Sequence, residues 1–170
     1  MIGERFIVYV VVGQIYDASL SPTNHTEQLE ITKSEEHTIF VRNTGNAPTD
    51  FTVAIDTTQA GDVEFEIVSP VNNKLFIAAG YEDSIRVRMT ANADANYDQF
   101  YMATVLVTAD EGQIALSSNI VANITENHSI IISALEELAV TPGTEEVIDF
   151  NLTNRGNLEE SISVNFTVEG

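Results

Sequence analysis

Five asparagines of this 170-residue chain lie in the pattern Asn-x-Ser/Thr, the acceptor of N-linked glycans in exported proteins. A glycan needs solvent, so each acceptor must face outward, and the alternation of side chains along a strand allows a check. Asn151 and Asn165 alternate with two phenylalanines, and Asn123 lies between two apolar residues. For any single position, chance occurrence in an asparagine- and threonine-rich chain is the alternative. The pattern predicts glycosylation at Asn24, Asn123, Asn127, Asn151 and Asn165.

A loop of alternating oxygen-bearing side chains is a candidate calcium site. Asn92, Asp94, Asn96 and Asp98 alternate as in the first half of an EF-hand loop. The twelfth position counted from Asp94 is Val105, so the bidentate glutamate of that motif is missing. The alternative is a solvated loop whose side chains form Asx-turns. Calcium held by Asp94, Asn96 and Asp98 is the one metal for which the sequence suggests ligands, and no other cofactor is expected.

The other reactive residue types form no catalytic arrangement in the sequence. The chain has no cysteine, which excludes disulfides and cysteine-based zinc or redox chemistry. The three histidines are scattered, and no serine or threonine lies in the strand–turn–helix setting of an activated nucleophile. His37 falls on the inward parity of its strand, which favours a residue at the edge of a core over a ligand. Paired glutamates such as Glu35 and Glu36 indicate a solvated face. We therefore expect no enzyme.

The charge of the chain excludes several classes of partner. Only 7 lysines and arginines stand against 26 aspartates and glutamates, for a net charge of −19. Such a surface cannot neutralise a row of phosphates, which excludes a nucleic-acid-binding protein, and it disfavours docking on an anionic membrane. A hydrophobic content of 44% is that of a folded protein. The surface favours cations, salt or basic partners.

One turn is repeated and sets the organisation of the chain. Asn43-Thr44-Gly45-Asn46 recurs 111 residues later as Asn154-Arg155-Gly156-Asn157, and the apolar positions on both sides recur with it. Self-similarity at a fixed spacing indicates tandem copies of one unit. We predict an N-terminal apolar strand over residues 1–16, a complete β-domain over 17–124, and a partial second copy over 125–170.

Short apolar–polar alternations, separated by turn signals every 8–12 residues or so, are typical of a β-sandwich. In one such run Ile39 and Val41 should face inward, and in another Ile85, Val87 and Met89 should do so. Residues 134–138 are the one short helical candidate. The fold class is all-β, with strands expected at 29–32, 37–42, 51–55, 63–68, 75–78, 84–90, 100–108, 114–124, 129–133, 147–153 and 161–168.

An unbroken apolar run opens the chain and has three interpretations. A membrane-spanning helix needs about 20 apolar residues, so insertion into a membrane is not expected. A signal peptide needs a basic start, which Glu4 contradicts. β-Branched and aromatic residues favour a strand buried on both faces. The spacing of 111 places this run on residues 117–123, the last strand of the domain. The candidate donor strand is Phe6, Ile7, Val8, Tyr9, Val10, Val11 and Val12.

Three stretches resemble a known family. They are the strand and turn Thr38–Asn46, the glycine-acidic turn and strand Ala79–Val87, and the aromatic-rich strand Tyr101–Val105. They are similar to the cell-adhesion-related Ig-like β-sandwich domains of bacterial and archaeal surface proteins, and equally to the accessory β-sandwich domains of bacterial α-galactosidases. The resemblance covers about residues 17–124 and recurs over 128–168. It implies an Ig-like fold in secreted or cell-surface tandem modules, and it transfers no catalytic residue.

These features together suggest an extracellular, glycosylated structural or adhesive subunit of an archaeal or bacterial filament, pilus or surface layer. Half a sandwich is not expected to be stable alone, so residues 125–170 should need completion by a neighbour or by downstream chain. The partners would be copies of the same chain, joined head to tail by addition of the N-terminal strand. The alternative is an accessory Ig-like module of a larger secreted protein, such as a glycoside hydrolase or an adhesin.

Overall fold

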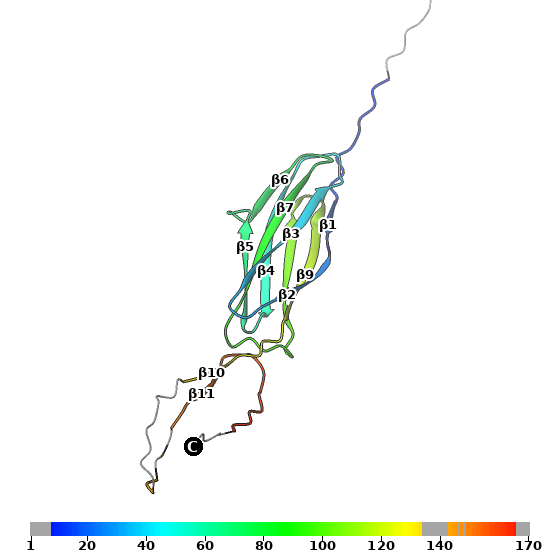
Figure 1. The fold of residues 1–170 in the computed structure, drawn as a ribbon. Helices are drawn as coiled ribbons and strands as arrows, with labels where there is room; N and C mark the ends of the chain where they lie inside the picture. The colour runs from blue at the N-terminus through cyan, green and yellow to red at the C-terminus, as the bar shows by residue number, and fades with distance from the viewer. Residues whose placement is uncertain (1–7, 134–142, 146, 148, 166–170) are drawn as a thin grey trace, which may run out of the picture.

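The computed structural model describes residues 8–133, 143–145, 147 and 149–165. Residues 18–124 form a sandwich of two sheets, which confirms the predicted all-β fold (Figure 1). Its elements are β1 Ala18–Ser21, β2 Asn24–Leu29, β3 Ser34–Asn43, β4 Thr49–Gln59, β5 Val63–Ser69, β6 Lys74–Ile77, β7 Glu82–Ala91, β8 Tyr101–Ala109, the 3-10 helix η1 Glu111–Gln113, and β9 Ile114–Ile124. One sheet has the order β1-β3-β7-β5, and the other has the order β2-β9-β8-β4-β6.

The core lies between the two sheets and follows the alternation in the sequence. Ile39 and Val41 of β3 are buried, as are Ile85, Val87 and Met89 of β7. The expected inward faces of these strands are therefore confirmed. The second sheet contributes its own alternate residues to the same core, chiefly Phe51, Val53, Tyr101, Ala103, Val105, Val107, Ile120, Ala122 and Ile124. Burial of this apolar surface is the main favourable term in folding.

The chain changes sheets at its first turn. β1 pairs with β3 in one sheet, and after Pro22 the chain continues as β2, which pairs in parallel with β9 in the other sheet. The sequence-based prediction of a strand at 29–32 was wrong by several residues, because this pairing runs from Asn24 to Leu29. The edge that β9 would otherwise present is thereby covered by β2.

A cluster of charged side chains lies on the outer face of the first sheet. Glu36 of β3 accepts hydrogen bonds from Arg86 at 3.1 Å and from Arg88 at 2.8 Å, and Arg88 also approaches Glu66 of β5 at 3.6 Å. The hydrogen bond from Arg88 is the main cause of the lowered pKa of Glu36. These groups are largely exposed, so the cluster contributes little to stability and chiefly favours the register of three neighbouring strands.

The second copy is represented by a strand pair. β10 Ile130–Ile132 and β11 Leu152–Asn154 pair in the same register as β1 and β3, with Ile130 opposite Asn154 as Ala18 is opposite Asn43. The predicted strand at 147–153 is thus shorter, and residues 161–165 form no strand, contrary to prediction. In the described residues no further strand pairs with this segment, which removes the hydrogen bonds a strand needs. The helical candidate at 134–138 and residues 166–168 lie outside the described residues.

The described part of the N-terminal apolar run, residues 8–12, lies outside the sandwich. These residues form no strand, and their side chains are between 74% and 91% exposed, so the expected burial on both faces is not found within this chain. The position that the run would take in a sandwich is filled here by β9. Phe6 and Ile7 lie outside the described residues. No helix in the described part of the chain is long and apolar enough to cross a membrane.

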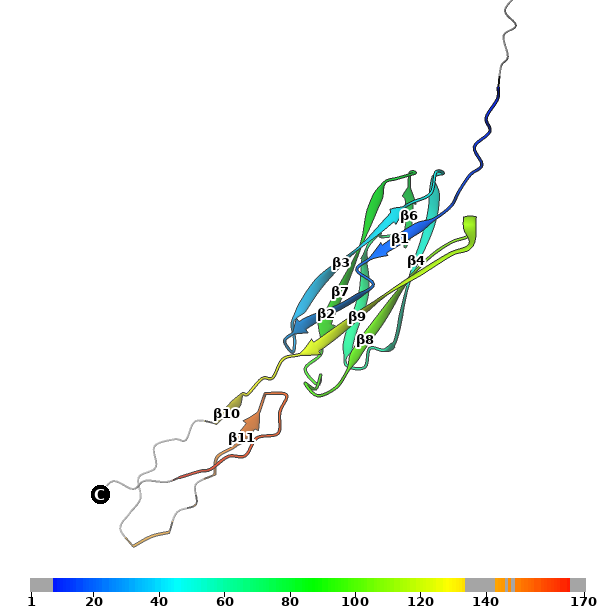
Figure 2. The ribbon, with the colours of Figure 1, turned by 90° about the vertical axis from the view of Figure 1, so that its right-hand side faces the viewer.

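Residues 8–12 and the second strand pair lie at opposite ends of the sandwich. Figures 1 and 2 agree that the N-terminal segment leaves at one end and that β10 and β11 lie beyond the end at which β9 finishes. A unit of this shape has a distinct head and tail along its long axis.

Candidate functional site

The repeated turn holds the segment through which the chain enters the sandwich. The backbone N–H of Asn46 donates to the carbonyl oxygen of Ile15 at 2.9 Å, and the N–H of Ile15 donates to Oδ1 of Asn46 at 2.7 Å. Nδ2 of Asn46 donates to the carbonyl of Gly13 at 3.0 Å. One side chain thus satisfies the backbone groups on both sides of Gln14, the carbonyl of Gly13 and the N–H of Ile15. This fixes an extended segment that belongs to neither sheet.

Gly45 allows the entering backbone to lie against the turn. Its N–H and that of Thr44 both donate to the carbonyl of Asp17, at 3.1 and 2.9 Å. A Cβ on Gly45 would overlap the carbonyl oxygen of Ile15 and would lie 3.0 Å from the amide nitrogen of Asp17. Both are backbone atoms and cannot rotate away. Glycine is required here for close approach of two backbones.

The buried side chain of Asn43 stabilises the turn by hydrogen bonds. Its side chain is buried, and Nδ2 donates to the carbonyls of Ala47 at 2.8 Å and of Ile77 at 2.9 Å. Its Oδ1 accepts the N–H of Gly45 at 3.0 Å. The amide therefore ties the turn to the end of β6. We call Asn43, Gly45 and Asn46, with the segment 13–17 that they hold, the first entrance clamp.

The contacts between the turn and the entering segment recur in the second copy. The N–H of Asn127 donates to Oδ1 of Asn157 at 2.8 Å, and the N–H of Asn157 donates to the carbonyl of Asn127 at 3.1 Å. Nδ2 of Asn157 donates to the carbonyl of Thr125 at 2.9 Å, as Asn46 does to Gly13. A Cβ on Gly156 would overlap the carbonyl oxygen of Asn127. Asn154, Gly156 and Asn157, with residues 125–129, form the second entrance clamp.

The second clamp begins where the sandwich ends, and one residue contributes to both. The N–H of Thr125 donates to the carbonyl of Leu29 in β2 at 3.0 Å, while its own carbonyl accepts from Asn157. β9 ends at Ile124, so no free linker separates the sandwich from the next unit. Hydrogen bonds on both sides of Thr125 define a short, directional joint.

The sequence predicted the two turns and their spacing but not their role as clamps. The four-residue pattern by itself indicates an ordinary connection between strands. The segment that it binds lies about thirty residues earlier in the chain, so the sequence near the turn does not reveal the contact. A signal was present in Asn46 and Asn157: an asparagine after the glycine is not needed for the turn itself. In both copies this asparagine binds the entering segment.

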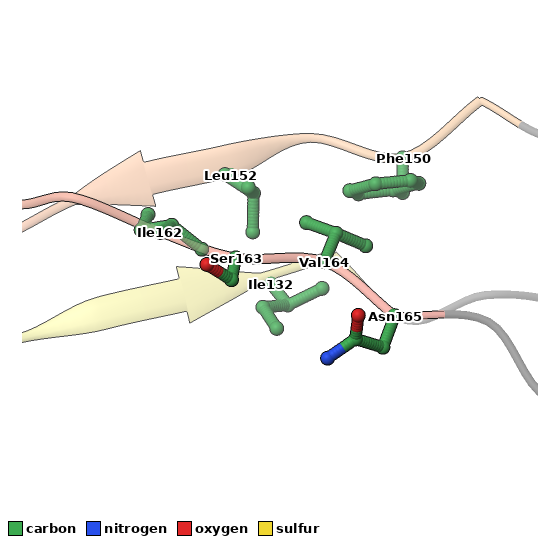
Figure 3. A pocket seen from close by; sticks show the side chains of 7 residues that line it. All are labelled: Ile132, Phe150, Leu152, Ile162, Ser163, Val164 and Asn165. Carbon is green, nitrogen blue, oxygen red and sulfur yellow. The ribbon is translucent and has the colours of Figure 1, made fainter.

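The second copy has an apolar groove of about 290 Å³. Figure 3 shows its lining side chains between β10, β11 and residues 162–165. Ile162 and Val164 are each 45% exposed, although Phe51 and Val53, at the same positions of the first copy, are fully buried. Among the described residues, the groove corresponds to half of a sandwich core whose other half is not present. It is lined by Ile132, Phe150, Leu152, Ile162, Ser163, Val164 and Asn165.

Most of the predicted glycan acceptors are on the surface. Asn24, Asn123, Asn151 and Asn165 are exposed. Oδ1 of Asn24 accepts a hydrogen bond from Asn119 at 3.2 Å. Asn127 is half-buried, and its backbone lies within the second entrance clamp. Glycosylation at the five positions stays a prediction.

The calcium candidates lie on one exposed loop before β8. Asp94, Asn96 and Asp98 are exposed, and Oδ1 of Asn96 accepts the N–H of Asp98 at 3.3 Å, as in an Asx-turn. The N–H of Asn96 donates to the hydroxyl of Tyr101 at 2.8 Å. Within the described ranges no three histidine, aspartate or glutamate side chains are grouped to hold a metal ion. Calcium at this loop also stays a prediction.

Two histidines that are apart in the sequence meet at the edge of the sandwich. The rings of His25 on β2 and His37 on β3 stack with centroids 3.6 Å apart, and Nε2 of His25 lies 2.8 Å from Glu27. Nε2 of His37 is buried and has no hydrogen-bond partner among the described residues. Burial, and secondarily His25, lowers the pKa of His37. The sequence placed His37 at an edge but did not indicate its neighbour, because the pairing depends on β2 crossing to the other sheet.

We expect the sandwich to lose stability as the pH falls below the ordinary histidine pKa of 6.5. The pKa of His37 is lower in the folded chain, so between the two values the unfolded chain binds the additional proton. Urea unfolding at pH 7.5 and pH 5.5 or so should therefore show a smaller pH effect in His37→Val than in the wild type. The pKa of His128 is raised by the hydrogen bond that its ring donates to the carboxylate of Glu160, so His128 has the opposite effect on the pH dependence, and has it equally in both proteins. Equal pH effects in the two proteins would contradict the assignment to His37.

No family model matches the chain, and no curated protein matches it. Three solved structures with similar folds are the ASH/PapD-like domain 7 of human CEP192, the periplasmic chaperone SfaE, and a Salmonella enterica SafA pilin in complex with the SafB chaperone. The CEP192 domain has 11% identity and a TM-score of 0.48, over 72% of this chain and 98% of that one.

The two chaperone structures have similar values. SfaE has 13% identity and a TM-score of 0.48, over 64% of this chain and 58% of that one. The SafA–SafB structure has 12% identity and a TM-score of 0.47, over 66% and 57%. This chain thus spans less than two thirds of either matched chain, and none of the three structures is an α-galactosidase accessory domain. The strand order and the buried core of this chain define its sandwich fold.

Proposed function

We propose that the chain is a structural subunit of an extracellular filament or surface layer of an archaeal or bacterial cell, assembled head to tail by β-strand addition. The observation that carries the proposal is the pair of entrance clamps. In the second clamp, the chain arrives directly from a core strand, β9. In the first clamp, the chain arrives from the exposed apolar residues 8–12. The equivalent position predicts that these residues are also a core strand, in a neighbouring unit.

The energetics favour burial of this segment. Val8, Tyr9, Val10, Val11 and Val12 are largely exposed, and burying an apolar side chain of this size gains about 1.5 kcal/mol or more. Main-chain hydrogen bonds along the added strand would accompany this gain, and the cost of ordering both partners would reduce it. An exposed run of this kind also invites uncontrolled aggregation, so a specific acceptor is favoured.

The acceptor that we propose is the open half-core of the second copy in another molecule. The groove between β10, β11 and residues 162–165 exposes apolar residues whose counterparts in the first copy are buried. The donor and acceptor lie at opposite ends of the long axis (Figure 2). A contact between different surfaces of two copies does not close on itself and produces a polymer. No catalytic role is proposed for the chain.

Removal of residues 1–12 should abolish assembly. At about 100 μM, the intact chain should form species larger than a monomer in size-exclusion chromatography with light scattering, because strand addition buries the apolar run. The truncated chain should be monomeric, with unchanged urea unfolding of the sandwich. A matched control replaces residues 1–12 with a Gly/Ser segment of the same length. A monomeric intact chain, or assembly that persists in both variants, contradicts strand addition.

The second candidate function is an accessory module within a longer secreted protein. The intrachain joint at Thr125 favours it, because this joint shows that one chain can pass from one unit to the next through the same clamp. Assembly would then require no second molecule. Expression with further sequence on either side distinguishes the two: monomers that become more stable when lengthened support the module, whereas polymers of the present chain support the subunit.

We expect native material to carry N-linked glycans at the exposed acceptors. Asn24, Asn123, Asn151 and Asn165 have the solvent exposure that a transferase needs. Intact-mass measurement of protein from the native cell should exceed the polypeptide mass by whole sugar units, and an Asn123→Gln variant should lose one glycan. A bare polypeptide mass from native material would contradict glycosylation.

A further inference from the structure

The structure changes the register that relates the N-terminal run to the repeat. The turns repeat at a spacing of 111, but the segments that they hold repeat at 112, with Ile15 equivalent to Asn127 in the paired hydrogen bonds. Ala18 and Ile130 are also equivalent, because they face Asn43 and Asn154. A spacing of 112 therefore applies to the chain before the turn, and it places residues 8–12 on Ile120–Ile124.

This shift of one residue decides which side chains face the core. Successive side chains of a strand point to opposite faces, so a slip by one exchanges the two sets. In β9, Ile120, Ala122 and Ile124 are buried, whereas Val121 and Asn123 are not. The spacing of 111 would have turned Tyr9 and Val11 inward. The spacing of 112 instead turns Val8, Val10 and Val12 inward.

From this equivalence, which rests on the proposed function, we infer that Val8, Val10 and Val12 enter the core of a second copy of this chain, while Tyr9 and Val11 face solvent. The added strand takes the position of β9. In the first copy that position lies between β2, which runs parallel, and β8, which runs antiparallel. Gly13 takes the place of Thr125, at the exit from the acceptor and the start of the first entrance clamp.

The hydrogen bonds at the exit agree with this register. The N–H of Thr125 bonds to the preceding sandwich, at Leu29, and its carbonyl bonds to the following clamp, at Asn157. The carbonyl of Gly13 already bonds to its clamp, at Asn46. The N–H of Gly13 is then the donor to the neighbouring copy. The joint between molecules would repeat the joint within the molecule.

The absence of cysteine from the sequence allows a direct test by thiol labelling. Single variants Val8→Cys, Tyr9→Cys, Val10→Cys, Val11→Cys and Val12→Cys are assembled and treated briefly with a maleimide, and the labelled fraction is read by mass. We expect positions 8, 10 and 12 to label at least about tenfold more slowly in the assembly than after its dissociation in urea, and positions 9 and 11 to label at similar rates in both. Val71→Cys, on an exposed turn, is the accessible control.

The outcomes distinguish a failure of the register alone from a failure of the proposed function. Protection at 9 and 11 instead of 8, 10 and 12 overturns the register and leaves strand addition in place. Equal protection at all five positions overturns the assignment of one face to solvent. Rapid labelling of all five in assembled material overturns both the register and strand addition. Variants and wild type that remain monomeric refute the proposed function, and this inference with it.

Discussion

Replacement of Asn43 by aspartate should destabilise the sandwich by about 3–5 kcal/mol at neutral pH, the usual cost of an uncompensated buried charge. Nδ2 of Asn43 donates to the carbonyls of Ala47 and Ile77, and the side chain is fully buried. In Asn43→Asp an acceptor oxygen would face these two carbonyl oxygens. Both carbonyls would also lose their donor. Urea unfolding followed by tyrosine fluorescence measures the effect.

The pH dependence of the deficit gives the variant a specific signature. A carboxyl in this buried position should have a pKa above that of an unfolded aspartate, so the folded state binds the additional proton. Stability relative to the wild type should therefore recover as the pH falls through that raised value. Asn154→Asp is the matched control, because the exposed Asn154 makes the two contacts within its turn, to Leu158 and Gly156, that Asn43 makes to Ala47 and Gly45. Equal costs at the two positions would contradict the role of burial.

The fold class followed from the sequence because one face of each strand is buried. Period-two alternation identified Ile39, Val41, Ile85 and Val87 as core residues, and all four are buried. The alternation of apolar and polar residues along a strand can be read from neighbouring residues whenever one face of the sheet is exposed to solvent. The boundaries of β2 could not be read from neighbouring residues in the same way. They depend on pairing with β9, about 95 residues later, which no short window of sequence reveals.

The candidate site was only half predictable for a similar reason. The repeat was readable as a turn motif, but its meaning depended on which backbone lay against it. Ile15 and Asn127 have unrelated side chains, because the clamps bind their backbone groups. Backbone recognition leaves no residue pattern on the recognised segment. Only the clamp residues themselves, the glycine and the two asparagines on either side of it, recur in the sequence.

The one-residue difference between the spacings shows why a repeat should be aligned by hydrogen bonds. From the paired residue of the first strand to that of the second, the first copy has one residue more than the second copy, because Ala18 pairs with Asn43 and Ile130 pairs with Asn154. An alignment on the turns alone therefore shifts every residue before the turns by one position. For β-strands such an error reverses inside and outside. The pairings of Ala18 with Asn43 and of Ile130 with Asn154 correct it without reference to side-chain type.

Gly45→Ala and Gly156→Ala should each release an entering segment from its clamp. A Cβ at either position overlaps a backbone carbonyl oxygen, of Ile15 or of Asn127, so the segment must detach. At the first clamp this disrupts the two bonds to Asp17 and those between Asn46 and residues 13–15. Each bond contributes about 0.5–1.5 kcal/mol, so the local loss should be roughly 2–3 kcal/mol after recovery of chain entropy. A local loss of about 2 kcal/mol makes the open state of the clamp roughly thirtyfold more populated. Hydrogen exchange at the amides of Thr44, Gly45 and Asn46 should become faster by the same factor.

The joint, rather than the core, should show the larger change. In Gly156→Ala the bonds of Asn157 to Thr125 and Asn127 are lost, so small-angle scattering should report a broader range of maximum dimensions. The atoms nearest to a Cβ on Gly156 belong to Asn127 and Ser129, which follow the last strand of the sandwich, so the unfolding midpoint of the sandwich should be unchanged. Gly13→Ala is the control for the first clamp, because a Cβ there meets no atom within 4 Å. If Gly13→Ala and Gly45→Ala accelerate amide exchange equally, a general loss of glycine flexibility explains the effect and the clamp does not.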